Sequence, residues 1–224
     1  MDRNDETTKG SNRLGRGFRR LALVLFAVLF VLTLLPASAG AASPAWRILP
    51  TANAGKQGND LRGMAALSPT DAWAVGSSFD EAQGATVPMA QHWDGAGWRL
   101  VPVAHASVGL SAVGGSSSTD VWAVGYASSP NGAEGLIEHW DGDSWEVVEA
   151  PAPPGTYVNT IFTDVLALAP DDAWAVGRWS IVPDAPPRPL IERWNGEAWQ
   201  IVDAPEFDTW TELYAVSGTG PDDV

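Results

Sequence analysis

The chain has 224 residues, of which 12 are Trp and none is Cys, and its 13 basic and 27 acidic residues give a formal net charge of −14. A hydrophobic fraction of 45% is typical of a folding chain, and the length fits one or two domains. The lack of Cys excludes a disulfide scaffold, a thiolate zinc site and a cysteine nucleophile. The acidic balance argues against a partner that offers a phosphate backbone.

The first forty residues have the layout of a signal peptide. Five basic side chains between residues 9 and 20 precede residues 21–35, which carry no charge, and small residues follow at 37–41. Fifteen residues are short for a membrane-spanning helix, which needs about 20. We therefore expect residues 1–39 to be a signal-peptide helix and the mature protein to be secreted and extracellular. The alternative is a protein anchored in the membrane by an uncleaved leader.

Removal of residues 1–39 takes six of the 13 basic residues and three of the 27 acidic ones, which leaves a net charge of −17. A surface of this sign repels nucleic acid and anionic lipid headgroups. We expect no nucleic-acid partner and, unless the leader is retained, no membrane partner for the mature form.

The remaining residues contain an internal repeat with a period near fifty. The hexapeptide Asp-Ala-Trp-Ala-Val-Gly around Trp73 recurs with one change around Trp122 and unchanged around Trp174, in successive steps of 49 and 52 residues. Each copy is followed by Trp-Asp/Asn-Gly-x-x-Trp, which places its two tryptophans at Trp93 and Trp98, Trp140 and Trp145, and Trp194 and Trp199. An apolar residue stands twelve positions before the first Trp of each copy: Leu61, Leu110 and Phe162. Nine of the 12 tryptophans are therefore repeat positions.

Each repeat is predicted to form four short strands. The first ends near Leu67, Gly115 or Leu168, and the second is the Trp-Ala-Val-Gly run. The third strand ends, and the fourth begins, at the two tryptophans of Trp-Asp/Asn-Gly-x-x-Trp. The Asp-Gly or Asn-Gly between them is a strong hairpin signal because both residues tolerate positive φ. The unit is a four-stranded antiparallel meander.

The second strand is apolar on both of its faces. Trp73 and Val75 fall on one face, and Ala72 and Ala74 fall on the other, so both faces must be covered. Radial packing of each sheet between two neighbours covers both faces, which predicts an all-β fold, a β-propeller of four-stranded antiparallel blades. We expect the repeat tryptophans to lie in the core between blades and not to stack on sugars.

The predicted organisation is a signal peptide at 1–39 and a partial propeller at 40–224, with blades at 61–103, 110–150 and 162–204. Residues 43–50 match a fourth strand and form an orphan outer strand, while residues 211–224 match the start of a further blade. Three blades fall short of the 4–8 of known propellers, so we expect this sequence to be a fragment of a protein with further blades.

The Asp-Val-Trp-Ala-Val-Gly strand, a variable loop and a strand that ends in Trp-Asp-Gly before a further Trp resemble the repeat of kelch and galactose-oxidase-type propellers. The resemblance covers residues 44–224. Kelch repeats have a Gly-Gly pair after the second strand, whereas here a single Gly is followed by Ser77, Tyr126 or Arg178. The copper chemistry of galactose oxidase needs a cross-linked Cys, which this chain lacks, so the resemblance implies a fold without that cofactor.

Binding residues are expected on the face that carries the variable loops, which join the second to the third strand of a repeat and the fourth strand to the first strand of the next repeat. Function commonly lies on variable loops held by a rigid frame. The alternative for each residue is an ordinary surface position. The candidate ligand-binding residues are Phe79, Asp80, Glu81, Tyr126, Arg178 and Trp179.

Catalytic and metal sites are not predicted. The Asp that opens each second strand is interpreted as the cap of an Asx turn, and these residues are Asp71, Asp120 and Asp172. His92 and His139 are interpreted as a shared surface position, because the third copy has Arg193 there. No calcium loop, phosphate loop or zinc-protease motif occurs, so no catalytic residue, metal or cofactor is assigned.

These observations predict a secreted binding or scaffold module that recognises a protein or a carbohydrate through its loop face, and they favour this over an enzyme. The alternative is a secreted hydrolase or lyase acting on polysaccharide, with its acidic residues in the central channel or in further blades. A third reading is a propeller that displays a further C-terminal domain.

Overall fold

The computed structural model describes residues 48–55, 58–105, 109–130, 132–155, 158–181, 185–205 and 209–224. The chain divides into two units, Met1–Ile48 and Leu49–Val224, and all of the described strands lie in the second. The predicted signal peptide and residues 43–47 of the predicted orphan strand lie outside the described residues. Residues 48–50 have no regular secondary structure.

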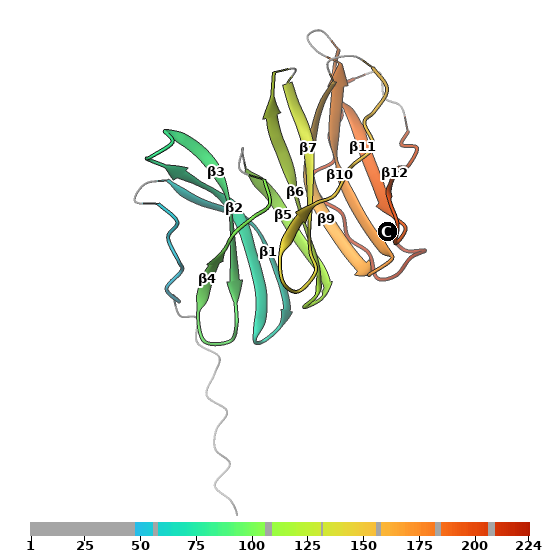
Figure 1. Cartoon of the computed structure of the whole chain (residues 1–224). Helices are drawn as coiled ribbons and strands as arrows, with labels where there is room; N and C mark the ends of the chain where they lie inside the picture. The colour runs from blue at the N-terminus through green and yellow to red at the C-terminus, as the bar shows by residue number, and fades with distance from the viewer. Residues whose placement is uncertain are drawn as a thin grey trace, which may run out of the picture. The chain divides into compact units, whose positions relative to one another are not determined.

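The unit Leu49–Val224 contains three four-stranded antiparallel sheets (Figure 1). The first sheet consists of β1 (Asn59–Ser68), β2 (Asp71–Asp80), β3 (Ala85–Trp93) and β4 (Trp98–Val101). The middle sheet consists of β5 (Leu110–Ser117), β6 (Asp120–Ser129), β7 (Gly132–Trp140) and β8 (Trp145–Val147). The third sheet consists of β9 (Val158–Ala169), β10 (Asp172–Ile181), β11 (Arg188–Trp194) and β12 (Trp199–Ile201). In each sheet the strands are adjacent in chain order, so all three are the predicted meanders.

The hairpin between the third and fourth strands of each sheet forms as predicted. In all three sheets the third strand ends, and the fourth begins, at the two repeat tryptophans. The glycines at the turns have positive φ, with 89° at Gly95, 106° at Gly142 and 93° at Gly196. The residue before each Gly closes the turn; Asp94 Oδ1, for example, accepts hydrogen bonds of 2.9 Å from the backbone N–H groups of both Ala96 and Gly97. The Asp-Gly and Asn-Gly signals therefore act through an Asx turn.

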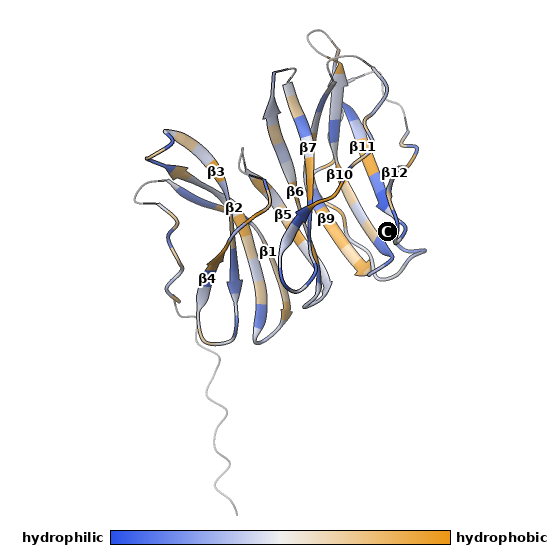
Figure 2. Cartoon of the chain, in the orientation of Figure 1, coloured by the Kyte–Doolittle hydropathy of each residue, from blue (hydrophilic) through white to orange (hydrophobic). Residues whose placement is uncertain are grey.

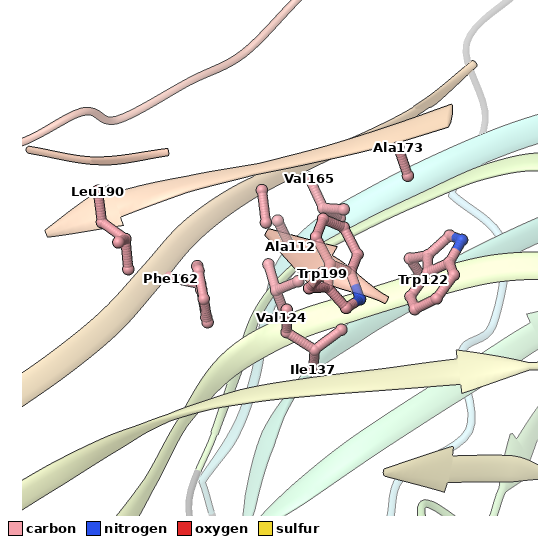
Figure 3. Close-up of a cluster of buried hydrophobic side chains, with 10 residues drawn as sticks. Ala112, Trp122, Val124, Ile137, Phe162, Val165, Ala173, Leu190 and Trp199 are labelled. Carbon is pink, nitrogen blue, oxygen red and sulfur yellow. The ribbon is translucent and has the colours of Figure 1, made fainter. Parts of the chain in front are cut away.

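Neighbouring sheets pack with the Trp-bearing face of one second strand against the next sheet. Trp73 and Val75 of β2 are buried in one cluster with Val121 and Ala123 of β6. The same arrangement recurs one sheet further on, where Trp122 and Val124 pack with residues of the third sheet (Figure 3), among them Phe162, Val165, Ala173, Leu190 and Trp199. The hydrophobic stretches in the strands of all three sheets (Figure 2) supply these clusters. Four of the nine repeat tryptophans are buried in the core between sheets, as predicted: Trp73, Trp122, Trp145 and Trp199. Trp140 and Trp194 pack against the same clusters while partly buried, whereas Trp93, Trp98 and Trp174 are half-buried and belong to neither cluster, so the prediction is wrong for these three.

Residues 211–216 lie against the third sheet without forming a strand. The backbone N–H of Leu213 donates to the carbonyl oxygen of Gly177 at 3.3 Å, and the Thr163 hydroxyl donates to the carbonyl oxygen of Leu213 at 2.5 Å. The backbone N–H of Val216 donates to Asp164 Oδ2 at 2.9 Å. These bonds hold the segment along β9 and β10.

Candidate functional site

Five of the six candidate residues lie on strands and not on loops, which corrects the prediction. β2 and β3 pair without interruption as far as Asp80 and Ala85, and β6 and β7 pair as far as Ser129 and Gly132. The predicted loops are shorter because the hairpin arms continue beyond the Gly that closes each Trp-Ala-Val-Gly run. Only Glu81 lies in the connection itself.

Three of the candidates, Phe79, Asp80 and Glu81, line a hollow of about 490 Å³ beside β2 and β3, which we call the first-sheet hollow. The carboxylate of Asp80 is occupied by its own turn. Its Oδ1 accepts backbone hydrogen bonds from Ala82 at 2.8 Å and Gln83 at 3.2 Å. These bonds, the one from Gln83 first, lower the pKa of Asp80 below its usual value. Asp80 therefore caps the hairpin.

Two further candidates, Arg178 and Tyr126, lie elsewhere. They occupy the same position in their repeats, four residues after the repeat Trp, on the face that carries that Trp. Arg178 Nε lies 3.4 Å from a carboxylate oxygen of Glu212, and its guanidinium carbon lies 6.0 Å from the ring centroid of Trp210. Arg178 therefore helps to hold the C-terminal segment to the third sheet.

The sixth candidate, Trp179, lines a separate hollow of about 400 Å³ beside β11 and β12, which we call the third-sheet hollow. Trp179 and Arg188 are directly opposite each other on β10 and β11, and the guanidinium carbon of Arg188 lies 5.4 Å from the Trp179 ring centroid. Asp203 adds a carboxylate, and the walls include five prolines: Pro153, Pro154, Pro186, Pro189 and Pro205. An aromatic ring, a cation and a carboxylate thus meet in one largely apolar concavity.

The two hollows occupy the same place in the repeat. Each is closed on one side by the residues eight and nine positions after a fourth-strand Trp: residues 54–55 follow Trp46 of the predicted orphan strand, and residues 153–154 follow Trp145. Each is closed on the other side by the second and third strands of its own sheet and by the residues that follow the fourth strand. The same concavity therefore forms beside the first and the third sheet, and the two differ in their lining.

The third copy differs from the others at three lining positions. Where it has Trp179, five residues after the repeat Trp, the first copy has Ser78 and the middle copy Ala127. Where it has Arg188, six residues before the next repeat Trp, the others have Val87 and Glu134. Asp203 corresponds to Pro102 and Glu149. The aromatic ring and the cation occur together in the third-sheet hollow alone among these three copies.

Sequence reasoning missed Arg188 and Asp203. Both residues lie in stretches whose sequence differs between the repeats. A comparison that looks only for residues shared by all copies therefore does not detect them. Alignment of the copies on their repeat tryptophans, followed by a search for positions at which one copy departs, would have found both residues.

The Asp residues that open the second strands do not cap Asx turns, and this prediction is wrong. Asp71 Oδ1 lies 2.9 Å from His92 Nε2, and Asp120 Oδ1 lies 2.8 Å from His139 Nε2. In the third sheet Arg193 Nε donates to Asp172 Oδ1 at 2.9 Å. The two residues of each pair are 19–21 positions apart in the chain. They meet because the second and third strands of each sheet pair with each other.

The His or Arg of each pair also stacks on the repeat Trp of its own sheet. The ring centroids of Trp122 and His139 are 4.2 Å apart, and the guanidinium carbon of Arg193 lies 4.9 Å from the Trp174 centroid. Burial acts to raise the pKa of Asp120, but hydrogen bonds from His139 and Ser116 outweigh it and hold that pKa below its usual value. These groups are structural triads of the sheet and not the plain surface position expected for His92 and His139.

Because Arg193 fills the same place as the two histidines, we expect His139→Arg to be tolerated and His139→Ala to lower the free energy of unfolding by about 1–3 kcal/mol. The Ala variant leaves the carboxylate of Asp120, which is 5% exposed, without its ring partner. Urea unfolding of the two variants beside the parent protein measures the difference. Equal loss in both would contradict the equivalence of Arg and His at this position.

Within the described residues, no three His, Asp or Glu side chains gather as they would around a metal ion. The same part of the chain contains no helix long and apolar enough to cross a membrane.

Comparison with known proteins identifies no family. No family model matches the chain, and no curated protein matches it either. Among solved structures, the chain is similar to a fucose lectin from Kordia zhangzhouensis in complex with methyl-fucoside, with a TM-score of 0.38 and 15% sequence identity, over 64% of this chain and 99% of that chain.

Proposed function

We propose that this protein is a carbohydrate-binding module and that the third-sheet hollow is its binding site. The observation that carries the proposal is the departure of one repeat from the others, since the same hollow recurs but Trp179 and Arg188 occur together in one copy alone. Substitutions that serve only the frame of a repeat are expected in every copy. A set confined to one copy points to recognition.

The lining suits a sugar ring. A pyranose has an apolar C–H face, which packs on an aromatic ring or on proline rings, and hydroxyl groups that both donate and accept hydrogen bonds. Arg188 supplies donors and Asp203 supplies acceptors. A volume of about 400 Å³ lies within the range of small-molecule sites. Apolar walls with a few polar groups are what such a ligand requires.

The proposal includes the architecture and the location. The three sheets are taken as consecutive blades of a β-propeller of kelch type, supported by the repeated packing of a Trp-bearing face on an Ala-bearing face. Residues 211–224 are taken as the opening of a further blade, supported by the bonds of Leu213 and Val216 to the third sheet. Residues 1–39 are taken as the export signal of a secreted binding or scaffold protein.

The test is binding of the full chain to a glycan panel that includes fucosides, followed by calorimetry on the best ligand. We expect Trp179→Ala and Arg188→Met to weaken that binding at least tenfold, which corresponds to about 1.4 kcal/mol for each variant. The matched controls are Ser78→Ala and Val87→Ala, which change the same repeat positions in the first sheet and are expected to leave affinity unchanged.

Three results would contradict this proposal. Equal effects of the third-sheet and first-sheet variants would remove the site from the third-sheet hollow. Silence on the panel together with specific capture of a protein ligand would favour a protein partner. Cleavage of a glycan would favour the polysaccharide-active enzyme.

A further inference from the structure

Glu192 is a fully buried carboxyl group on β11, with 0% of its surface exposed. It lies opposite Ala175 of β10 and Ile201 of β12, on the face that the third sheet turns toward the middle sheet. Within the described part of the chain, neither of its carboxylate oxygens has a hydrogen-bond partner. A buried polar group without a partner is costly, so its retention calls for an explanation.

The two other sheets have a buried polar residue at the same position, two residues before the last Trp of the third strand. In both, that residue binds the segment that arrives from the preceding repeat. Gln91 Nε2 donates to the carbonyl oxygen of Ala52 at 2.7 Å. Glu138 accepts from the backbone N–H groups of Ala104 at 3.2 Å and His105 at 2.8 Å. The position therefore fastens consecutive repeats together.

The third sheet lacks this fastening, and its arriving segment differs from the others at one of the positions that make it. Ala52 stands six residues after Trp46 of the predicted orphan strand, and Ala104 stands six residues after Trp98. The corresponding residue in the segment that reaches the third sheet, six residues after Trp145, is Pro151. Proline has no backbone N–H, so one of the two donors that meet Glu138 in the middle sheet, that of Ala104, has no counterpart. The other donor, His105, corresponds to Ala152, whose N–H makes no hydrogen bond to Glu192. Burial alone then raises the pKa of Glu192 to about 8.

No charged neighbour contributes to this shift. The titratable groups on the surrounding elements are Arg188 on β11, Asp203 after β12, Asp120, Tyr126, His139 and Glu146 on the facing strands of the middle sheet, and Glu149 on the arriving segment. His139 is already bound to Asp120.

We propose that Glu192 is a proton-dependent latch on the seam between the middle and third sheets, closed when its carboxyl is protonated and opened when it ionises. The charged form cannot stay in an apolar seam without a partner, so ionisation is coupled to separation of the two surfaces or to entry of water. Leu190 and Ile201 flank Glu192 and also line the third-sheet hollow, so the latch lies beside that hollow. The latch itself does not depend on what the hollow binds.

The direction of the pH effect follows from proton binding. The ordinary pKa of a Glu carboxyl is 4.5, and burial raises the pKa of Glu192 to about 8 in the closed state. Between these two pH values the closed state holds a proton that the open state releases. Rising pH therefore favours opening through this range and has no further effect through Glu192 above it.

The test is hydrogen exchange of the full chain, followed by mass spectrometry, from pH 5 to pH 9, with each rate corrected for its intrinsic pH dependence. We expect the opening of amides in β11 and β12 to increase up to tenfold per pH unit and to level near pH 8. Glu192→Gln, which copies Gln91, is expected to abolish the increase. Pro151→Ala restores a backbone donor and is expected to reduce it.

Glu138→Gln is the matched control and is expected to leave the increase in the third sheet unchanged. A flat profile in the parent protein would overturn the proposal. An increase that persists in Glu192→Gln would assign the effect to another group and overturn it equally. Ligand affinity does not enter this measurement, so its outcome is separate from that of the proposed function.

Discussion

Replacing Trp122 by Ala is expected to lower the free energy of unfolding by about 3–5 kcal/mol. The indole is 1% exposed and lies between the middle and third sheets. Its ring centroid is 5.0 Å from that of Trp194 and 5.1 Å from that of Trp199, the latter at an interplanar angle of 89°. Its N–H donates to Asp120 Oδ1 at 3.2 Å. Truncation removes these contacts and leaves a cavity that two rigid sheets cannot fill by small shifts.

The matched control is Trp174→Ala in the third sheet. Trp174 holds the same repeat position but is only half-buried, and its ring contact is with Arg193 of its own sheet. We expect the loss to be less than half of that at Trp122. Denaturant unfolding followed by far-ultraviolet circular dichroism gives both values. Similar losses would mean that contact between sheets contributes little and that packing within a sheet dominates.

The strand pattern could be predicted from sequence because its determinants are local. The turn residues Asp94 and Gly95 and the tryptophans on either side of them mark the ends of two strands, and the same marks recur in the other copies. Three repeats in one register also remove the ambiguity that a single short apolar run would leave. The meander follows, since each connection is too short for anything but an adjacent antiparallel partner.

The candidate site could be predicted only in part because its determinants are not local. Trp179 was found as an aromatic residue near a variable stretch, but its partner Arg188 depends on the register of β10 with β11. The extent of that hairpin was underestimated, because polar residues near its tip carry no apolar alternation. Likewise, the pairing of Asp120 with His139 joins residues 19 positions apart, which spacing alone does not indicate.

The buried carboxyl at Glu192 was equally hidden from sequence reasoning. A Glu between an Ile and an Arg on a short strand gives no sign of full burial. Its significance appears only when the arriving segment is placed beside it and Pro151 is found where Ala104 stands in the middle sheet. Repeats therefore predict the frame well, whereas the proposed binding site and the proposed latch depend on positions at which the copies differ.

Replacing Gly125 by Ala is expected to lower the free energy of unfolding by at least about 3 kcal/mol, although the change adds one methyl group. A Cβ at this position would overlap the carbonyl oxygen of Gly109 and lie 3.0 Å from Leu110 Cα. Both obstacles are backbone atoms, one at the start of β5 and one in the residue before it, so no side-chain rotation can relieve the overlap. The Gly that closes each Trp-Ala-Val-Gly run meets the same obstacle in the other sheets, from Asp60 at Gly76 and from Ile161 at Gly177.

Gly97→Ala provides the control, because a Cβ there meets nothing within 4 Å and the backbone φ is not in the positive range. The equivalent residues in the other copies are Ser144 and Ala198, so the fold already accepts a side chain at this position. We expect a change within about 0.5 kcal/mol for Gly97→Ala. Thermal unfolding of the two variants separates a steric requirement for Gly from a general preference. A Gly125→Ala protein as stable as its parent would show that the first and second strands can move apart, and that the close approach of β5 to β6 does not hold the sheet together.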